Sequence, residues 1–152
     1  MKIAIGSDHN GFELKEEIKW YLDNEKYEFI DYGCHSCDAV DYPDVAFRVA
    51  EDISVNKVDR GILICGTGIG VAIAACKYPG IRAALCHDTY SAERAQLSNN
   101  AQILTMGAQI IGPEVGKKVV AAYLNSFWSG GSERKVKKIT EKENEFISKS
   151  IK

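Results

Sequence analysis

The fold is decided by one stretch near the middle of the chain, Ile62-Leu63-Ile64-Cys65-Gly66-Thr67-Gly68-Ile69-Gly70-Val71-Ala72. A continuous apolar run of strand length enters a glycine-rich turn, and small apolar residues then continue to Cys76 like a short buried helix. Backbone N–H groups at the start of a helix attract negative charge. The stretch therefore predicts a strand, a turn and a helix, with an anion site in the turn.

Three kinds of anion site fit a glycine-rich turn, and two of them lack a required residue. A dinucleotide fingerprint needs G-x-G-x-x-G, and Val71 stands where the third glycine belongs. A phosphate-binding P-loop needs G-K-[ST], but no lysine follows until Lys77. A nucleotide-binding module is therefore the least favoured function. The third interpretation is an oxyanion hole built from the amides of Gly66, Gly68, Ile69 and Gly70.

Cys65 is the strongest candidate for chemistry, because it ends the strand and adjoins the predicted helix start. N–H donors and the helix dipole at that position favour a thiolate. The thiolate suits a nucleophile or a general base, and the Thr67 hydroxyl follows within plausible reach. The alternative is a buried cysteine that acts as a small hydrophobe. That alternative is our interpretation of Cys76 and Cys86, which lack such a setting.

Outward from this stretch, short apolar runs alternate with helical patterns. The runs are Ile3–Gly6, Tyr27–Tyr32, Gly61–Cys65, Ile81–Leu85 and Ile103–Thr105, with Ile110-Ile111 close behind. Helical spacing of apolar residues covers Leu14–Leu22, Ala46–Ile53 and Val115–Tyr123, and a last helix is expected from about Ser132. This alternation predicts an α/β, Rossmann-like, doubly wound sheet of about five parallel strands, with helices on both faces and a C-terminal helix.

Ligands of such sheets bind beyond the carboxyl ends of the strands, so polar residues there are candidate site residues. Asp8 and His9 follow the first strand and are expected at the same edge as Cys65. An acid beside a histidine can move protons and contact an anionic ligand. Alternatively, Asp8 or Asn10 caps the next helix.

Other polar positions allow both a binding and a structural interpretation. Tyr42 can reach a ligand hydroxyl or pack in a turn. Ser98-Asn99 can form a turn or bind a polyol. Ser132, Arg134 and Lys135 open the last helix, where they can bind phosphate or face solvent.

Composition narrows the function further. The chain has 152 residues, 45% hydrophobic and 26% charged, which predicts one globular domain over residues 1–152. A net charge of −2 gives the chain no overall positive charge with which to bind nucleic acid. We expect no membrane span and no signal peptide, and hence a cytoplasmic protein with five free cysteines. Cys34-x-x-Cys37 lacks two further ligands for zinc, so no metal site is predicted.

These motifs together resemble one family, ribose-5-phosphate isomerase B with the related galactose-6-phosphate isomerase subunits. In order along the chain, the matching strings are G-S-D-H-N-G-F-E-L-K (6–15), D-Y-P-D (41–44), G-I-L-I-C-G-T-G-I-G (61–70), G-I-R-A-A (80–84) and N-N-A-Q-I-L (99–104). The resemblance implies an aldose–ketose isomerase of the pentose phosphate pathway. It would interconvert ribose 5-phosphate and ribulose 5-phosphate through an enediolate, without metal or cofactor.

The resemblance also implies a role for each matching residue. Cys65 would be the base that removes the C2 proton, and Thr67 would help to hold the thiolate. The amides of the Gly66–Gly70 turn would stabilise the enediolate. Asp8 would move protons between sugar oxygens or help to open the ring. The roles of the remaining residues would be phosphate binding for His9, sugar-oxygen binding for Asn99 and lining of the pocket for Tyr42.

The family further implies a homodimer or tetramer in which each site is shared across the dimer. Three parts of the chain depart from the family pattern. Ser98 replaces a ring-opening histidine, Gln109 replaces an arginine, and Ser132 and Lys135 replace two more, with Arg134 as a possible substitute. Fewer arginines mean fewer bidentate phosphate contacts. The alternatives are therefore an isomerase of a hexose 6-phosphate, of allose or galactose type, or a non-catalytic subunit of a two-chain isomerase.

Overall fold

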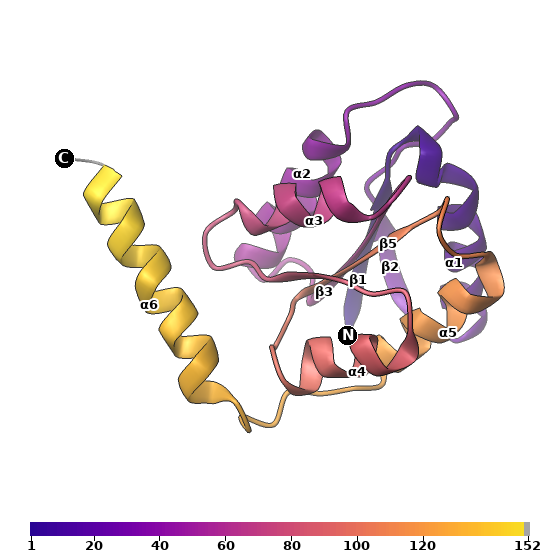
Figure 1. The fold of residues 1–152 in the computed structure, drawn as a ribbon. Helices are drawn as coiled ribbons and strands as arrows, with labels where there is room; N and C mark the ends of the chain where they lie inside the picture. The colour runs from indigo at the N-terminus through magenta and orange to yellow at the C-terminus, as the bar shows by residue number, and fades with distance from the viewer. Residues whose placement is uncertain (151–152) are drawn as a thin grey trace.

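A computed structural model describes residues 1–150; residues 151–152, the end of the predicted single domain, lie outside the described residues. Five parallel strands form one sheet in the order β2-β1-β3-β5-β4 (Figure 1). The strands are β1 (Lys2–Ser7), β2 (Glu28–Asp31), β3 (Arg60–Cys65), β4 (Ala83–Leu85) and β5 (Ile103–Gly107). The three central strands are almost wholly buried, which explains their continuous apolar runs.

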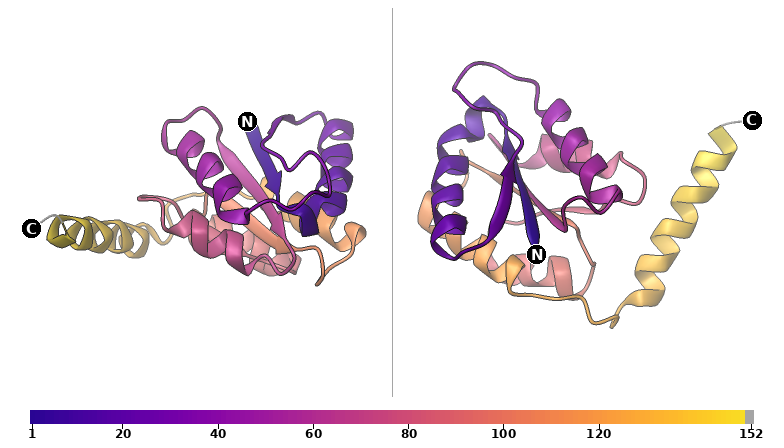
Figure 2. Two further views of the ribbon diagram at one scale, coloured as in Figure 1. Left: turned by 90° about the horizontal axis from the view of Figure 1, so that it is seen from above. Right: turned by 180° about the vertical axis from the view of Figure 1, so that it is seen from behind.

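Helices cover both faces of the sheet, as the alternating pattern predicts (Figures 1 and 2). They are α1 (Phe12–Asn24), α2 (Tyr42–Ser54), α3 (Ile69–Cys76), α4 (Thr89–Leu97), α5 (Pro113–Leu124) and α6 (Glu133–Ser150), with a short 3-10 turn, η1 (His9–Gly11), before α1. Helices α1, α4 and α5 share one core with the sheet, and α2 and α3 share the other. The fold class is therefore confirmed.

The parallel register defines two edges of the sheet, and the site depends on the difference between them. At the carboxyl edge, Ser7 lies beside Ile64, and Cys65 lies beside Gly107. At the amino edge, the buried Arg60 donates to the carbonyls of Tyr123 at 2.7 Å and of Leu124 and Ser126 at 3.4 and 2.7 Å. These contacts satisfy carbonyls at the end of α5 and fix the point from which the chain leaves for α6.

Helix α6 stands beside the body of the protein and buries none of its residues (Figures 1 and 2). Within residues 1–150, one hydrogen bond joins α6 to the body of the protein: Glu143 Oε2 accepts the Gly80 N–H at 2.7 Å. Ile139 and Phe146 are more than half exposed on this helix. No helix of the described chain is both long and apolar enough to cross a membrane.

Two details differ from the sequence-based expectations. Helix α4 was not predicted, because its buried side is made of Ala92, Ala95 and Gln96, which give no strong apolar period. The apolar pair Ile110-Ile111 lies in a turn after β5, where the amides of both residues bond to the Gly107 carbonyl.

Candidate active site

The Cys65–Gly70 turn brings a thiol and several amides together at the carboxyl edge. Cys65 is only 4% exposed, and its Sγ accepts the N–H of Gly68 at 3.1 Å. Gly68 has a φ of +77°, a conformation that glycine adopts without steric cost. The Thr105 hydroxyl holds this turn by donating to the Gly68 carbonyl at 3.0 Å. The turn therefore directs an N–H donor at the sulfur.

Thr67 and Ile69 form the exposed rim of the turn above the buried sulfur. The Thr67 Oγ1 accepts the N–H of Ile69 at 3.3 Å. This local bond fixes the hydroxyl on the solvent side of the turn. It lies at the same edge as Cys65, as predicted, but its protein partner is the Ile69 amide and not the thiol.

Two side chains from other elements flank the turn. A Cβ placed on Gly70 would lie 2.7 Å from the Tyr42 ring, so the ring rests directly on this glycine. A Cβ on Gly66 would lie 3.0 Å from Gln109 Oε1. The Gln109 N–H also donates to the Gly66 carbonyl at 2.9 Å. Tyr42 and Gln109 therefore line the turn from opposite ends, and Gln109 provides a neutral amide at the position where the family pattern has an arginine.

Asp8 and His9 lie at the same edge, beside the end of β3. The Asp8 N–H donates to the Ile64 carbonyl at 3.2 Å, and its Oδ1 accepts from the Gly11 N–H at 3.0 Å. The alternative role as a helix cap is thus realised, because Asp8 caps η1. His9 Nδ1 accepts the N–H of Val40 at 3.3 Å and so tethers the loop before α2.

A buried lysine supports this edge of the sheet, and nothing in the sequence indicated that it would be buried. Lys15 is fully buried, and its Nζ lies 2.7 Å from Asp31 Oδ2. Asp31 Oδ1 accepts the Gly33 N–H at 2.9 Å, and the Gly33 carbonyl accepts the Ser7 N–H at 2.6 Å. Burial alone would raise the pKa of Asp31, but hydrogen bonds from Lys15, Lys19 and the Gly33 amide outweigh it, so this pKa lies below its usual value. The ion pair thereby fixes the loop beside Ser7 and Asp8.

Ser98 and Asn99 lie at the other edge of the sheet. They follow α4 and precede β5, whose first residue, Ile103, lies beside Gly61 at the amino end of β3. Gly61 and Cys65 are separated by about 13 Å of strand. The Arg82 guanidinium holds this turn by donating to the carbonyls of Asn99 and Asn100 at 2.9–3.2 Å. In one chain, Asn99 is therefore remote from Cys65.

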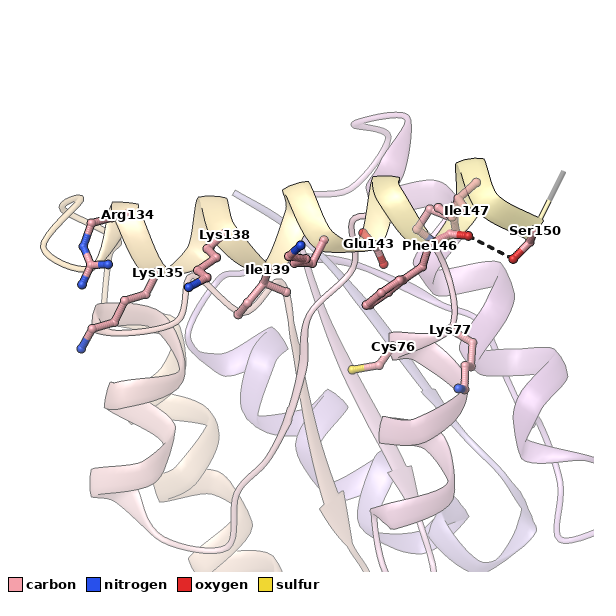
Figure 3. A pocket seen from close by; sticks show the side chains of 12 residues that line it. Cys76, Lys77, Arg134, Lys135, Lys138, Ile139, Glu143, Phe146, Ile147 and Ser150 are labelled. Carbon is pink, nitrogen blue, oxygen red and sulfur yellow. Dashed lines mark hydrogen bonds between the residues drawn. The ribbon is translucent and has the colours of Figure 1, made fainter. Parts of the chain in front are cut away.

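Ser132 immediately precedes α6, outside the Cys65 turn. Arg134 and Lys135 lie in the first turn of α6 (Figure 3). Arg134 and Lys135 are exposed at one end of a groove of about 1140 Å³ between α6 and the end of α3. Figure 3 shows Ile139 and Phe146 directed from α6 toward this groove. The predicted site residues thus form a carboxyl-edge group around Cys65 and a second group, which comprises Ser98, Asn99, Ser132, Arg134 and Lys135.

The other cysteines differ from Cys65 in their surroundings. Burial raises the pKa of the Cys86 thiol to about 11, with a smaller contribution from Asp88. The Cys76 Sγ accepts the N–H of Ala83 at 3.2 Å. Within residues 1–150, no group of three or more His, Cys, Asp or Glu side chains is placed to hold a metal ion.

Known proteins resemble this chain over nearly its whole length. The Ribose/Galactose Isomerase family matches residues 3–139. A Listeria innocua protein named ribose-5-P isomerase B is 52% identical over 131 residues, which cover 86% of this chain and 88% of the relative. A Pectobacterium atrosepticum protein named D-erythrulose-4-phosphate isomerase is 49% identical over 141 residues, covering 91% and 93%. The structure of Clostridium thermocellum ribose-5-phosphate isomerase B superposes with a TM-score of 0.94 at 45% identity, covering 96% of this chain and 99% of that one. The chain belongs to the ribose/galactose isomerase family.

Proposed function

We propose that this chain is an aldose–ketose isomerase that interconverts ribose 5-phosphate and ribulose 5-phosphate through an enediolate, with Cys65 as the general base. The observation that carries the proposal is the N–H of Gly68 aimed at the Cys65 Sγ at 3.1 Å. The sulfur sits at the start of α3 and at the carboxyl edge of a parallel sheet, where ligands of such folds bind. Relatives named as isomerases of ribose 5-phosphate support the choice of sugar.

In the proposed mechanism, the thiolate removes the proton from C2 of the open-chain aldose and returns it to C1. A second proton moves from O2 to O1, and we assign this transfer to Asp8. The electron pair stays within the sugar, so substrate and product balance without an external oxidant or reductant. Negative charge grows on the substrate oxygens in the enediolate, and we assign its stabilisation to amides of the Gly66–Gly70 turn. The N–H groups of Gly68 and Ile69 already donate to Cys65 Sγ and Thr67 Oγ1, so the other amides of the turn are the candidates.

We further propose that a second copy of the chain completes each site. The carboxyl edge of one protomer carries Cys65 and Asp8, and the amino edge carries Asn99, so one chain alone holds two separate half-sites. A two-fold axis that brings unlike edges together creates two equal complete sites. The basic residues at the start of α6, Arg134 and Lys135, would then neutralise the substrate phosphate.

Exposed apolar surface supports the dimer. Helix α3 is apolar on all sides, a composition typical of a buried helix, yet Ile69 is 50% and Ile73 is 58% exposed. Phe146 on α6 is 62% exposed beside the open groove. Because α3 begins in the Cys65 turn, a second copy that covers it also closes the site. We therefore name a second copy of this chain as the partner.

Mixing two inactive variants tests the shared site. Cys65→Ala removes one half-site and Asn99→Ala weakens the other, so each homodimer is expected to be impaired in both sites. After equal amounts are unfolded and refolded together, about half of the dimers are mixed, and each mixed dimer has one intact site. Recovery of about one quarter of wild-type turnover supports the proposal. No recovery beyond the sum of the two variants shows that each site lies within one chain.

A substrate panel tests the reaction itself. Purified protein with EDTA is expected to convert ribose 5-phosphate and ribulose 5-phosphate in both directions, and Cys65→Ala is expected to lose at least about 100-fold in turnover. The panel includes D-erythrulose 4-phosphate, because a relative with that substrate in its name is 49% identical. It also includes allose and galactose 6-phosphates. Faster turnover of any of these sugars overturns the assignment to ribose, and inactivity on all of them favours a subunit that needs a different partner chain.

Ser98 gives a second check on the same assay. A serine hydroxyl does not titrate near neutral pH, so ring opening falls to Asp8 or to spontaneous opening in solution. Ser98→His is expected to raise turnover of ribose 5-phosphate, which is largely cyclic. An unchanged rate shows that ring opening does not limit this enzyme. We also propose a cytoplasmic location, which the five free cysteines support because reducing compartments preserve thiols.

A further inference from the structure

His87 follows β4 and has no part in the mechanism above. Its Nε2 accepts the N–H of Gly107, the last residue of β5, at 2.9 Å. A ring nitrogen that accepts a hydrogen bond carries no proton, so the neutral ring here is protonated on Nδ1. The backbone ladder between β4 and β5 ends at Leu85 and Thr105, apart from the bond from the Cys86 N–H to the Thr105 carbonyl. The imidazole therefore supplies an acceptor beyond the point where the strands stop pairing.

Gly107 is in direct contact with the Cys65 turn. A Cβ on Gly107 would lie 2.6 Å from the carbonyl carbon of Thr67, so the two backbones touch. The next two amides continue the contact, because Ala108 donates to the Cys65 carbonyl and Gln109 to the Gly66 carbonyl, both at 2.9 Å. The backbone of residues 107–109 thus packs against the turn and supports it. We expect a displacement of residues 107–109 to shift the Cys65 sulfur and the neighbouring amides.

We propose that His87 is a positioning residue for the Cys65 turn. It anchors residues 107–109 through the Gly107 N–H. Its neighbour Leu85 supports the same turn by packing, since a Cβ on Gly68 would lie 2.6 Å from Leu85 Cδ1. The expected effect of His87 on turnover rests on the proposed role of Cys65 as the base. The positioning of the turn by His87 does not depend on that role.

Three variants test this role. His87→Gln keeps a side-chain acceptor near the position of Nε2, and His87→Leu removes the acceptor at similar size. Tyr90→Leu is the control, because Tyr90 lies in the first turn of α4 and is 69% exposed. Within residues 1–150, its side chain makes no hydrogen bond to β5. For each variant we would measure kcat and KM for ribose 5-phosphate, thermal unfolding, and amide hydrogen exchange in peptides that cover residues 65–70.

We expect His87→Leu to lower kcat about tenfold, because small misplacements of a reacting group are costly, and to leave KM within about twofold. Exchange in residues 65–70 should become faster in this variant. His87→Gln should restore both values, and Tyr90→Leu should match the wild type. If His87→Leu does not fold, His87→Ala assayed with and without added imidazole replaces it, with rescue by imidazole expected.

Equal defects in His87→Gln and His87→Leu overturn the proposal, as does wild-type exchange in residues 65–70 of the leucine variant. Failure of imidazole to rescue His87→Ala overturns it as well. A wild-type chain that is inactive on every sugar phosphate removes the proposed function instead. In that case the exchange measurements still decide whether His87 holds the turn.

Discussion

Replacing Gly107 by alanine tests how closely the end of β5 supports the Cys65 turn. The added methyl carbon would lie 2.6 Å from the Thr67 carbonyl carbon and 2.7 Å from its Cα and its oxygen, whereas ordinary contact begins at 3.4 Å. The two backbones must therefore separate by about 0.8 Å, since no side-chain rotation can relieve the clash. Overpacking of this kind costs about 1–3 kcal/mol of unfolding free energy. A shift of nearly 1 Å in the turn should lower turnover about 100-fold.

The assay compares turnover and urea unfolding of Gly107→Ala with those of Gly116→Ala. Gly116 is also buried, but a Cβ there would meet Leu14 at 3.4 Å, which is ordinary contact. Because Gly116 lies inside α5, alanine should stabilise the protein by about 0.5–1 kcal/mol and leave turnover unchanged. A Gly107→Ala variant with wild-type turnover and wild-type stability would refute the claim that this strand end sets the position of Cys65.

Other substitutions test the supports around the site. Arg60→Leu should lower the unfolding free energy by about 3 kcal/mol in urea titrations, because it strands buried carbonyls at the end of α5. Asp31→Asn should cost about 1.5–3 kcal/mol at pH 7, since it removes a charged partner of the buried Lys15. The pKa of Asp31 is lowered in the folded state, so its stabilisation is complete above the usual value of 3.8 and is lost as the pH falls through the lower folded value. Wild type and Asp31→Asn should therefore converge in acid, and a constant difference would contradict this. The double variant Phe146→Asp, Ile139→Asp should be a monomer in sedimentation experiments and should show no turnover in the activity assay. An intact, active dimer would exclude α6 from the interface.

The three central strands were predictable because burial on both faces gives them continuous apolar runs. Most helices were predictable because their apolar residues recur at helical spacing. Helix α4 was not predicted, because its buried side consists mainly of alanines, which give no strong apolar period. Lys15 also escaped notice, because the sequence gives no sign that a lysine is fully buried until Asp31 and Glu16 are seen within 2.9 Å of it.

The candidate site was predictable only in part, because composition shows chemistry but not which edge of the sheet carries it. Cys65, Asp8 and Gly70 could be assigned to the carboxyl edge from the direction of their strands. The position of Asn99 depends on α4, which returns the chain to the amino edge, and that helix was not predicted. The role of His87 depends on a contact with Gly107, 20 residues away in the chain, which no local pattern indicates.

The placement of half-sites on opposite edges has an evolutionary consequence. In the proposed dimer, a gene duplication produces two chains that each need to preserve only one edge in a mixed assembly. One copy can lose Cys65 and the other can lose Asn99, and a mixed pair still retains one complete site. An obligate two-gene isomerase can therefore arise from this architecture by loss alone, without any new contact between the chains.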